Sequence, residues 1–598
     1  MLRNLTLRFG AGPGEPPLSF APGPMTVFVG PNNSGKSLAL RELESLIESG
    51  DPSLLHIVRS ILPRLPDADT VERMVRSREV EGDALPDGSV RVLRLSARDD
   101  GVGKRATDVS EPPREHVVDL AALRAAVEQD TLGGEEFRRV CRDFLSLFAL
   151  RLDGQTRLAL TQPRPAGGQH ANHLAVLFRD HAARERIREI TADALGLHFT
   201  IDPTGAPHLR IRMSERPPLD LDEEQALDGR ARAFHGRAHD IAGLSDGVRA
   251  FTGLTAAVMS ADYRLMLVDE PEAFLHPPLI RKLGKRLTEL AAERGANLLA
   301  STHSPEFVMG CIQSGKRVNI VRLTWRDGLA TARLLSADKL ETMMRDPLLR
   351  STGVLGALFH EGAIVCEADA DRVFYAEINE RLLGARAGGA DGCVFLNAQN
   401  KQTIRRIVRP LREMGVPAVA LVDLDILKGK DDFRELMRAV FVPSVFWEPW
   451  EERRKRLHQE MRNDDYKAGG IYTLGREARL QANALLAGLA EYGLFVVPVG
   501  ELENWLPELE VGGHGPEWLT QLFHRMGTDP HSPTYQRPSG GGVWKFMQGV
   551  AAWIADPHRR GMADEVIDVD HQLSPPELQS HTEAQRHGEE PLRGDRAA

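Results

Sequence analysis

Short apolar runs alternate with helical patterns along much of the chain. A run of four to six apolar residues predicts a strand that is buried on both sides. The clearest runs of this kind lie within residues 25–29, 265–268, 298–300, 362–366 and 417–422. Helical periodicity follows the first run over 38–48, with Gly50 at its end, and follows the fourth over 372–383. This alternation predicts an α/β protein whose parallel sheets carry helices on both faces.

The segment from about 50 to 235 is predicted to be a long, mostly helical insertion. Its predicted helices are 118–129, 135–150 and 173–195, the last with Gly196 as C-cap. Its predicted strands are 90–95, 156–161 and a hairpin of 198–201 with 208–213. The charged stretch 220–232 is expected to be a solvated loop.

The alternating pattern weakens between residues 345 and 356, and we place a domain boundary near 355. The predicted units are 1–355, with the insertion at about 50–235, and 356–570, with a helical insert at about 426–492. The last residues, 571–598, are polar and predict a disordered tail.

The composition is that of a soluble globular protein. The 598 residues are too many for one core, and 42% are hydrophobic and 27% charged. The net charge of −10 gives no global attraction to nucleic acid, so such binding would need local patches. The four cysteines have no metal-site or disulfide spacing, and no apolar run is long enough to cross a membrane. We therefore expect a cytoplasmic protein without a membrane partner.

The strongest chemical signal is a glycine-rich turn between the first predicted strand and helix. It matches G-x-x-x-x-G-K-[ST] at every fixed position, and such a turn binds phosphates through backbone N–H groups, a helix N-terminus and a lysine. The nucleotide-binding residues predicted here are Gly30, Asn32, Asn33, Ser34, Gly35, Lys36 and Ser37. Ser37 is also expected to contact Mg²⁺.

Three later motifs complete the pattern of a nucleotide-hydrolysing site. Ser245 and Gly247 open a predicted helix, Asp269 and Glu270 end the second apolar run, and His303 follows the third. Phosphoryl transfer requires neutralised charge, a cation and an oriented water molecule, and these groups can supply all three.

These motifs resemble those of the RecF- and SMC-like ATP-binding-cassette ATPases of recombination, repair and chromosome maintenance. The resemblance implies that Asp269 holds Mg²⁺, that Glu270 orients and polarises the attacking water, and that His303 senses the γ-phosphate. It also implies that Ser245 and Gly247 bind ATP held by a second copy, although Asp246 and Val248 depart from the usual signature loop.

Acidic residues follow two predicted strands of the second half. Glu367 and Asp371 come after 362–366, and Asp423 and Asp425 come after 417–422. Sites in parallel sheets lie at the carboxyl ends of strands, and oxygen ligands of this kind suit Mg²⁺ or Mn²⁺.

This spacing resembles the toprim catalytic domain of topoisomerases, primases and old-family nucleases, with Ala368 in place of the usual glycine. The resemblance implies a further metal ligand after the last strand, for which Glu503 is our choice and Glu501 the alternative. It also implies a lysine that stabilises the transition state, for which Lys545 in a glycine-rich loop is the candidate. A basic helix beside the site is a possible phosphate contact through Lys401, Arg405, Arg406, Arg409 and Arg412.

An ATPase cassette followed by a toprim domain is the arrangement of the overcoming-lysogenisation-defect (OLD) family. The resemblance implies an ATP- and Mg²⁺- or Mn²⁺-dependent nuclease of anti-phage defence. It also implies at least a homodimer, with DNA as the favoured substrate and a second defence protein as a possible partner. Two alternatives stay open: an ATPase sensor or scaffold with a degenerate toprim domain that recruits an effector, and a toprim ribonuclease that acts on tRNA.

Overall fold

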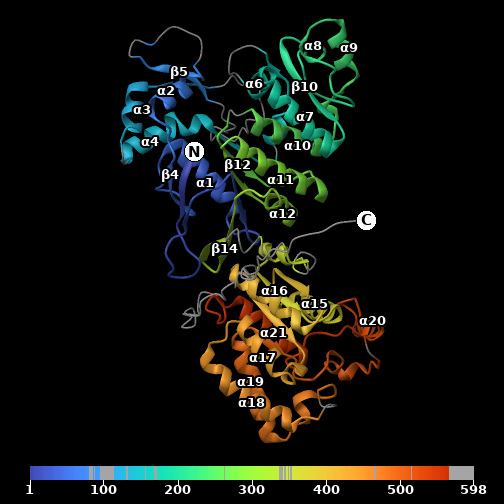
Figure 1. Cartoon of the computed structure of the whole chain (residues 1–598). Helices are drawn as coiled ribbons and strands as arrows, with labels where there is room; N and C mark the ends of the chain where they lie inside the picture. Colours follow the sequence, from blue (N-terminus) through green and yellow to red (C-terminus); the bar gives the residue numbers. More distant parts are fainter. Residues whose placement is uncertain are drawn as a thin grey trace, which may run out of the picture.

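The computed structural model describes residues 1–79, 85, 88–94, 114–129, 132–154, 156–166, 172–260, 263–335, 341, 345–347, 349, 353–462, 466–513 and 515–563. The predicted disordered tail, 571–598, lies outside the described residues. Figure 1 shows the N-terminal half, blue to green, above the C-terminal half, yellow to red, with β14 close to the junction.

The N-terminal half is built on a six-stranded sheet in the order β15-β14-β3-β13-β12-β7. All neighbours pair in parallel except β14 and β15. The strands are β3 (Met25–Val29), β7 (Ala149–Leu152), β12 (Leu265–Asp269), β13 (Asn297–Ser301), β14 (Val318–Arg326) and β15 (Leu329–Leu335). The three apolar runs predicted as strands in this half are confirmed.

Both faces of this sheet are covered. Successive side chains of a strand point to opposite sides of the sheet, so neighbouring residues contact different layers. Val27 belongs to one hydrophobic cluster and its neighbour Phe28 to another. On the Val27 side lie α10 (Asp246–Met259), α11 (Pro277–Glu293) and α12 (Pro305–Gln313). On the Phe28 side lie α1 (Lys36–Ser49), α4 (Gly134–Asp143) and the small sheet of β1 (Leu2–Leu7), β2 (Ser19–Phe20) and β4 (Val58–Pro63).

Two predictions between residues 135 and 161 are wrong. The helix predicted over 135–150 ends with α4, and its last residues form β7, which pairs with β12. A short apolar run suits a buried helix or a strand, and pairing with a distant strand decides between them. The strand predicted over 156–161 is instead α5 (Thr156–Ala159), because the Asp153 carboxylate accepts from the Thr156 N–H at 2.9 Å.

Other predicted elements of this segment are confirmed with small shifts. Asp180 divides the helix predicted over 173–195, and Gly196 ends its second part with φ 70°. The predicted hairpin is antiparallel as expected. The confirmed elements are β5 (Val90–Arg94), α3 (Leu120–Val127), α6 (His173–Arg179), α7 (His181–Leu195), β9 (His198–Asp202) and β10 (His208–Ser214). Two further elements, α2 (Ala68–Arg76) and β6 (Arg114–Val118), had no counterpart in the prediction.

The solvated loop predicted over 220–232 is also wrong. It contains α8 (Leu221–Gln225) and the start of α9 (Gly229–Arg237). Glu224 is 1% exposed and accepts hydrogen bonds from Arg184 and Arg188, 40 and 36 positions away. The local pattern of charges does not show that such distant partners exist, so the burial of Glu224 could not be predicted from it.

The C-terminal half contains a four-stranded parallel sheet in the order β17-β16-β18-β19. Its strands are β16 (Gly362–Cys366), β17 (Cys393–Asn397), β18 (Ala418–Val422) and β19 (Leu494–Val496). Val365 and Ile364 belong to different hydrophobic clusters, so this sheet too is covered on both faces. Its helices are α15 (Asp369–Gly384), α16 (Lys401–Glu413), α17 (Lys430–Ala439), α18 (Trp447–Glu460), α19 (Arg476–Glu491), α20 (Gly515–Met526) and α21 (Gly542–Ala555).

One residue of the predicted basic helix has a structural role instead. Arg412 of α16 is fully buried, and its guanidinium donates to backbone carbonyl oxygens of Ala418, Val440, Tyr492 and Gly561. It therefore cannot contact a nucleic acid backbone.

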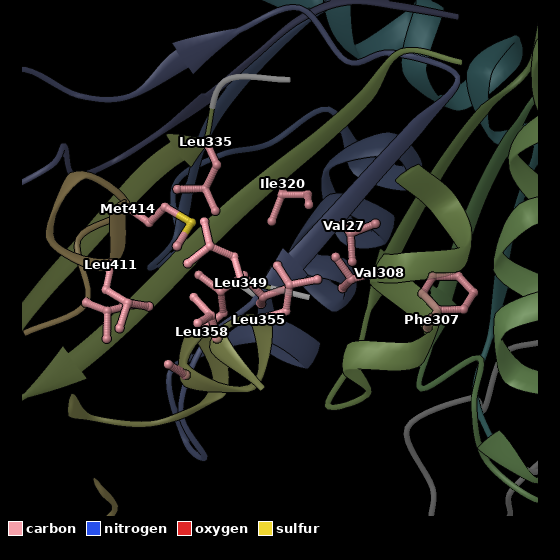
Figure 2. Close-up of a cluster of buried hydrophobic side chains, with 14 of the residues drawn as sticks. Val27, Phe307, Val308, Ile320, Leu335, Leu349, Leu355, Leu358, Leu411 and Met414 are labelled. Atoms are coloured by element: carbon pink, nitrogen blue, oxygen red, sulfur yellow. The ribbon is translucent and has the colours of Figure 1, made fainter. Parts of the chain in front are cut away.

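A buried apolar cluster joins the two halves. Figure 2 shows members of this cluster from both halves: Ile320 and Leu335 of the first sheet, Leu411 and Met414 of α16 and its C-terminal end, and Leu355 from the segment that connects them in the chain. No helix in the part of the chain that the structure describes is long and apolar enough to cross a membrane.

Arg322 of β14 adds polar contacts to this junction. It is 3% exposed and donates to the carbonyl oxygens of Leu358 at 3.3 Å, His360 at 2.8 Å and Gly415 at 2.8 Å. Burial lowers the pKa of Arg322 to about 10. These contacts tie the first sheet to the segments just before β16 and β18.

Candidate nucleotide site and candidate metal centre

The turn from Gly30 to Ser37 links β3 to α1 and has the curled backbone expected of a phosphate-binding loop. Gly30, Asn33 and Gly35 all have positive φ angles, of 142°, 61° and 91°. A Cβ atom on Gly30 would lie 2.0 Å from the Leu323 carbonyl oxygen, so only glycine fits there. Asn32 and Asn33 are exposed, whereas Ser34 is buried within the turn.

Lys36 places its charge inside this loop. It is 4% exposed, and its Nζ donates to the carbonyl oxygens of Gly30 at 2.8 Å and Pro31 at 2.6 Å. Burial lowers the pKa of Lys36 to about 8, against the opposing effect of Asp269 and Glu270. These two carboxylates therefore act on the lysine electrostatically across the site.

The end of β12 meets the loop directly. Asp269 Oδ1 accepts a hydrogen bond from Ser37 Oγ at 2.8 Å and another from the Ser301 hydroxyl of β13. Glu270 follows with φ 51°, and its N–H donates to the Ser301 carbonyl oxygen at 2.9 Å. The structure thus brings Ser37, Asp269 and Glu270 to one edge of the sheet, as the sequence predicted.

His303 reaches the same edge from the end of β13. Its backbone N–H donates to Glu272 Oε1 at 2.7 Å, which ties it to the segment that follows β12. Burial, and next the charge of Lys36, lower the pKa of His303. Glu272, to which sequence reasoning gave no role, therefore connects the ends of two neighbouring strands.

Ser245 and Gly247 lie at the start of α10. The Ser245 hydroxyl accepts from the Val248 N–H, and a Cβ atom on Gly247 would lie 2.7 Å from the Phe274 carbonyl oxygen. Ser245 is exposed. Among the described residues, no hydrogen bond joins either of them to the phosphate-binding loop of the same chain.

Sequence reasoning also missed Arg157, which lies behind β12. Its Nη2 donates to the Asp269 carbonyl oxygen at 2.5 Å. Arg157 lies in the segment 156–161, which was wrongly predicted to be a strand, and no role was therefore assigned to it. The alternating Ala149–Leu152 run, followed by Asp153-Gly154, was the signal of a strand and turn that could have revealed it.

The predicted acids of the second half converge at the carboxyl ends of neighbouring strands. Glu367 follows β16, Asp423 and Asp425 follow β18, and Asp371 lies in the first turn of α15. Burial, and then the charges of Glu367, Asp371 and Asp425, raise the pKa of Asp423 to about 9. Carboxylates that raise each other's pKa in this way would be stabilised by a cation.

The neighbouring acids are affected in the same direction. Burial raises the pKa of Glu367 to about 7, and Asp425 and Asp371 add to this effect. Burial raises the pKa of Asp371 to about 6, with a further contribution from Glu503. The site is therefore a dense, partly buried group of negative charges.

Three of these acids are bound to donors of the protein itself. Glu367 accepts from the Asp423 N–H and Asp371 from the Ala368 N–H, each at 2.9 Å. Asp425 Oδ2 accepts from Lys401 Nζ at 2.8 Å. With the side chains in these orientations, the described residues contain no group of three or more His, Cys, Asp or Glu side chains that could hold a metal ion.

The donor set nevertheless fits a hard divalent cation. Asp425 Oδ1 is buried and has no hydrogen-bond partner among the described residues, and the groups around it are carboxylate oxygens, which Mg²⁺ and Mn²⁺ prefer. Side-chain rotation, with release of Asp425 by Lys401, would free the oxygens that such an ion needs.

Both candidate glutamates after β19 lie near this group. Glu501 contributes to the raised pKa of Asp423, and Glu503 to that of Asp371. Glu501 also forms an ion pair with Lys467 at 3.4 Å. The structure brings both residues to the acids and does not choose between them.

Lys545 was predicted to lie in a loop, but the structure places it in the first turn of α21, which starts at Gly542, the last residue of the glycine run. It is exposed, and no ion pair joins it to the acids in the described part of the chain. The next residue, Phe546, packs against Tyr375 and Trp505, so α21 contacts the elements that carry Asp371 and Glu503.

Ala368 does not disturb the site. Its φ of −130° and ψ of 171° are extended values that any residue adopts, and its side chain is exposed. Tyr375 is 1% exposed, and its hydroxyl accepts from Trp505 Nε1 at 2.9 Å, so this tyrosine packs in the core.

Two family models match the chain. Residues 214–309 match the model described as "AAA domain, putative AbiEii toxin, Type IV TA system", and residues 358–425 match "Overcoming lysogenization defect protein-like, TOPRIM domain". The protein therefore contains an ATPase domain followed by a toprim domain. In this order, the two matches correspond to an OLD-family ATPase with a C-terminal toprim domain.

Curated relatives match shorter parts. The phosphonates import ATP-binding protein PhnC 2 of Rhodopseudomonas palustris is 30% identical over 140 residues, which are 23% of this chain and 46% of that protein. The thiamine import ATP-binding protein ThiQ of Cereibacter sphaeroides is 34% identical over 102 residues, 17% of this chain and 41% of that protein. The chain thus spans less than half the length of these relatives.

Among solved structures, an SMC head bound to the C-winged helix domain of ScpA is 15% identical with a TM-score of 0.32, covering 58% of this chain and 99% of that chain. The SMC head domain from Thermotoga maritima is 14% identical with a TM-score of 0.28, covering 56% and 99%.

Proposed function

We propose that this protein is an ATP-hydrolysing, divalent-metal-dependent nuclease whose ATPase controls cleavage by its toprim domain. The observation that carries the proposal is the meeting of half-buried acids at neighbouring strand ends, where Asp423 has its pKa raised to about 9 and Asp425 Oδ1 has no partner among the described residues. Such an arrangement disfavours ionised carboxylates unless a cation binds among them.

In the ATPase site, the turn from Gly30 to Ser37 binds the phosphates of ATP, with Lys36 contacting them through its ammonium group. Ser37 and Asp269 hold the accompanying Mg²⁺, which neutralises phosphate charge when bound. Glu270 accepts a hydrogen bond from the attacking water and orients it, and His303 contacts the γ-phosphate.

Ser245 and Gly247 bind ATP held by a second copy, which makes the working unit at least a homodimer. Ser245 is exposed and Gly247 half-buried at the start of α10, which supports this role because a partner can approach this end of the helix.

In the toprim site, Glu367, Asp371, Asp423 and Asp425 hold one or two Mg²⁺ or Mn²⁺ ions, with Glu503 or Glu501 completing the second position. Such ions lower the pKa of water and neutralise the scissile phosphate. Lys401, next to Asp425, and Lys545, at the start of α21, supply positive charge to the nucleic acid backbone. The acids are fixed by strand ends and α15, which limits their movement during the reaction.

The biological proposal is cleavage of DNA in anti-phage defence, in the cytoplasm, with a second defence protein as a possible partner. The order of the ATPase and toprim matches supports it.

The test is conversion of supercoiled plasmid to nicked or linear DNA in Mg²⁺ or Mn²⁺, with and without ATP. Wild type is compared with Asp423→Ala and Lys36→Ala. We expect wild type to cut the plasmid only when the metal is present. Asp423→Ala should abolish this cutting, and Lys36→Ala should abolish the response of cutting to ATP. Intact plasmid under every condition would refute the DNA nuclease, and the same variants are then tested on tRNA.

A second candidate is an ATPase sensor or scaffold that recruits an effector. The specific observation in its favour is that Asp423 N–H, Ala368 N–H and Lys401 already occupy three of the acids. This candidate predicts ATP hydrolysis without cleavage of any nucleic acid.

A further inference from the structure

Arg157 of α5 is a fully buried cation that contacts the end of β12. It is 0% exposed, and its Nε donates to the Asp153 carbonyl oxygen at 3.0 Å, while Nη2 donates to the Asp269 carbonyl oxygen at 2.5 Å. Burial of an arginine is costly, so its partners give information about its role. One of these partners is the backbone of the nucleotide site itself.

The peptide bond between Asp269 and Glu270 is hydrogen-bonded at both ends. Its carbonyl oxygen accepts from Arg157, and its N–H donates to the Ser301 carbonyl oxygen at 2.9 Å. These two bonds fix the plane of the peptide, and therefore the directions in which the two neighbouring carboxylates leave the backbone.

Glu270 needs this support because its backbone is in an unfavourable conformation. Its φ of 51° lies in the left-handed region, where a Cβ atom is crowded by the backbone. A non-glycine residue stays there only when its surroundings hold it. The hydrogen bond from Arg157 is one of the contacts that do so, beside those of the Glu270 N–H with Ser301 and of the Glu270 carbonyl oxygen with the Ala273 N–H.

The charge of Arg157 also suits this position. Burial lowers its pKa, but Glu272, Asp153, Glu270 and Asp269 act in the opposite direction. Arg157 Nη1 and Glu272 Oε2 are both buried without a hydrogen-bond partner among the described residues. The guanidinium is thus a counter-charge for the acidic end of β12.

Arg157 also contacts the helix that begins with the signature residues. Its short helix, α5, packs against α10, and a Cβ atom on Gly253 of α10 would lie 3.1 Å from the Arg157 carbonyl oxygen. A movement of α10, which begins at Asp246, would therefore displace Arg157 and with it the Asp269–Glu270 peptide.

We propose that Arg157 is a positioning residue for ATP hydrolysis, which orients the Glu270 carboxylate by holding the Asp269–Glu270 peptide and links that peptide to α10. The inference rests on the proposed ATPase function. It assigns Arg157 to the hydrolysis step and not to ATP binding, which the turn from Gly30 to Ser37 performs.

Steady-state ATP hydrolysis of the full chain tests this role with Arg157→Gln and Arg157→Lys. The matched control is Arg164→Gln, because Arg164 lies in the same segment, is half-buried and likewise donates to a backbone carbonyl oxygen, that of Ala159 at 3.0 Å. We expect Arg157→Gln to lower kcat by about 10²-fold while KM changes by less than about threefold, since a misplaced catalytic group affects the transition state. Arg157→Lys, which keeps the charge and one donor, restores part of kcat, and Arg164→Gln leaves kcat near the wild-type value.

Thermal melting and binding of a fluorescent ATP analogue separate positioning from folding. Unchanged kcat in Arg157→Gln overturns the inference. A parallel loss of melting temperature and analogue binding in both Arg157 variants also overturns it, because the role would then be structural. If wild type hydrolyses ATP and Lys36→Ala does not, the proposed function survives either result.

Discussion

Arg322 lies where the two halves meet, and Arg322→Met should loosen this junction. The substitution keeps a long apolar side chain but removes donors from three carbonyl oxygens, those of Leu358, His360 and Gly415. Hydrogen bonds from a charged donor contribute about 1.5–3 kcal/mol each, so the gross loss is about 4–9 kcal/mol.

Part of this loss is offset, because methionine does not carry the burial penalty of the guanidinium. That penalty lowers the pKa of Arg322 from 12.5 to about 10. The difference corresponds to about 3 kcal/mol, which leaves a net destabilisation of roughly 1–6 kcal/mol. With an unfolding entropy of about 2.1 cal/mol/K per residue over the 598 residues, we expect a melting temperature lower by about 1–5 °C in scanning calorimetry.

The matched control is Arg326→Met, at the end of the same strand. Arg326 is more exposed and lies 3.8 Å from Asp327. Because the Gly30 backbone lies against Leu323, next to Arg322, the response of plasmid cutting to ATP should also weaken in Arg322→Met only. Equal melting temperatures of the two variants would refute the reasoning.

Three further predictions concern single residues. Gly247→Ala would place a Cβ atom 2.7 Å from the Phe274 carbonyl oxygen and should lower ATP hydrolysis by about tenfold or more. The control, Gly243→Ala, places its Cβ atom where nothing lies within 4 Å and should not lower the rate. Equal rates of hydrolysis in the two variants would contradict the packing argument. Lys401→Met leaves Asp425 without its cation, so Mg²⁺ should raise the melting temperature more than in wild type. The control is Lys430→Met, which removes a more exposed lysine paired with Glu451. No difference between the two variants would mean that Lys401 does not compete with metal. Burial lowers the pKa of His173 from 6.5 to about 4, so between these pH values the unfolded chain binds a proton that the folded state does not. The free energy of unfolding should therefore decrease by about 1.4 kcal/mol for each pH unit as the pH falls from 6.5 to 4. His173→Gln should reduce this slope in denaturant titrations while exposed His524→Gln should not, and an unchanged slope in His173→Gln would contradict the assignment.

The sequence was sufficient for features that depend on neighbours along the chain. The strand, glycine turn and lysine of the phosphate loop form one continuous pattern, and acids directly after buried strands indicate the edge of a parallel sheet. For this reason the positions of Lys36, Asp269, Glu367 and Asp423 could be predicted before any contact between them was known.

Features that depend on distant partners could not be predicted in this way. Pairing with β12 makes a strand of Ala149–Leu152, and Arg184 and Arg188 bury Glu224. The contacts of Arg157 and Arg322 are to backbone carbonyl oxygens far away in the sequence, and a carbonyl group carries no residue-specific signal.

The basic residues near the toprim acids show the same limit. Lys401 and Arg412 looked equivalent on one helix, yet the first pairs with Asp425 and the second is buried among carbonyl oxygens. The glycine run before Lys545 suggested a loop, but a helix can start directly after an extended Gly541.

The central claim is that the acids at the ends of β16 and β18 form a divalent-metal site. Binding of Mn²⁺ to the nucleic-acid-free protein, followed by electron paramagnetic resonance at saturating ATP, tests it independently of the substrate. The account predicts that Asp423→Asn weakens binding of at least one Mn²⁺ by tenfold or more, which corresponds to about 1.4 kcal/mol, while the ATP-associated Mn²⁺ is retained. Identical titrations of wild type and Asp423→Asn would contradict it.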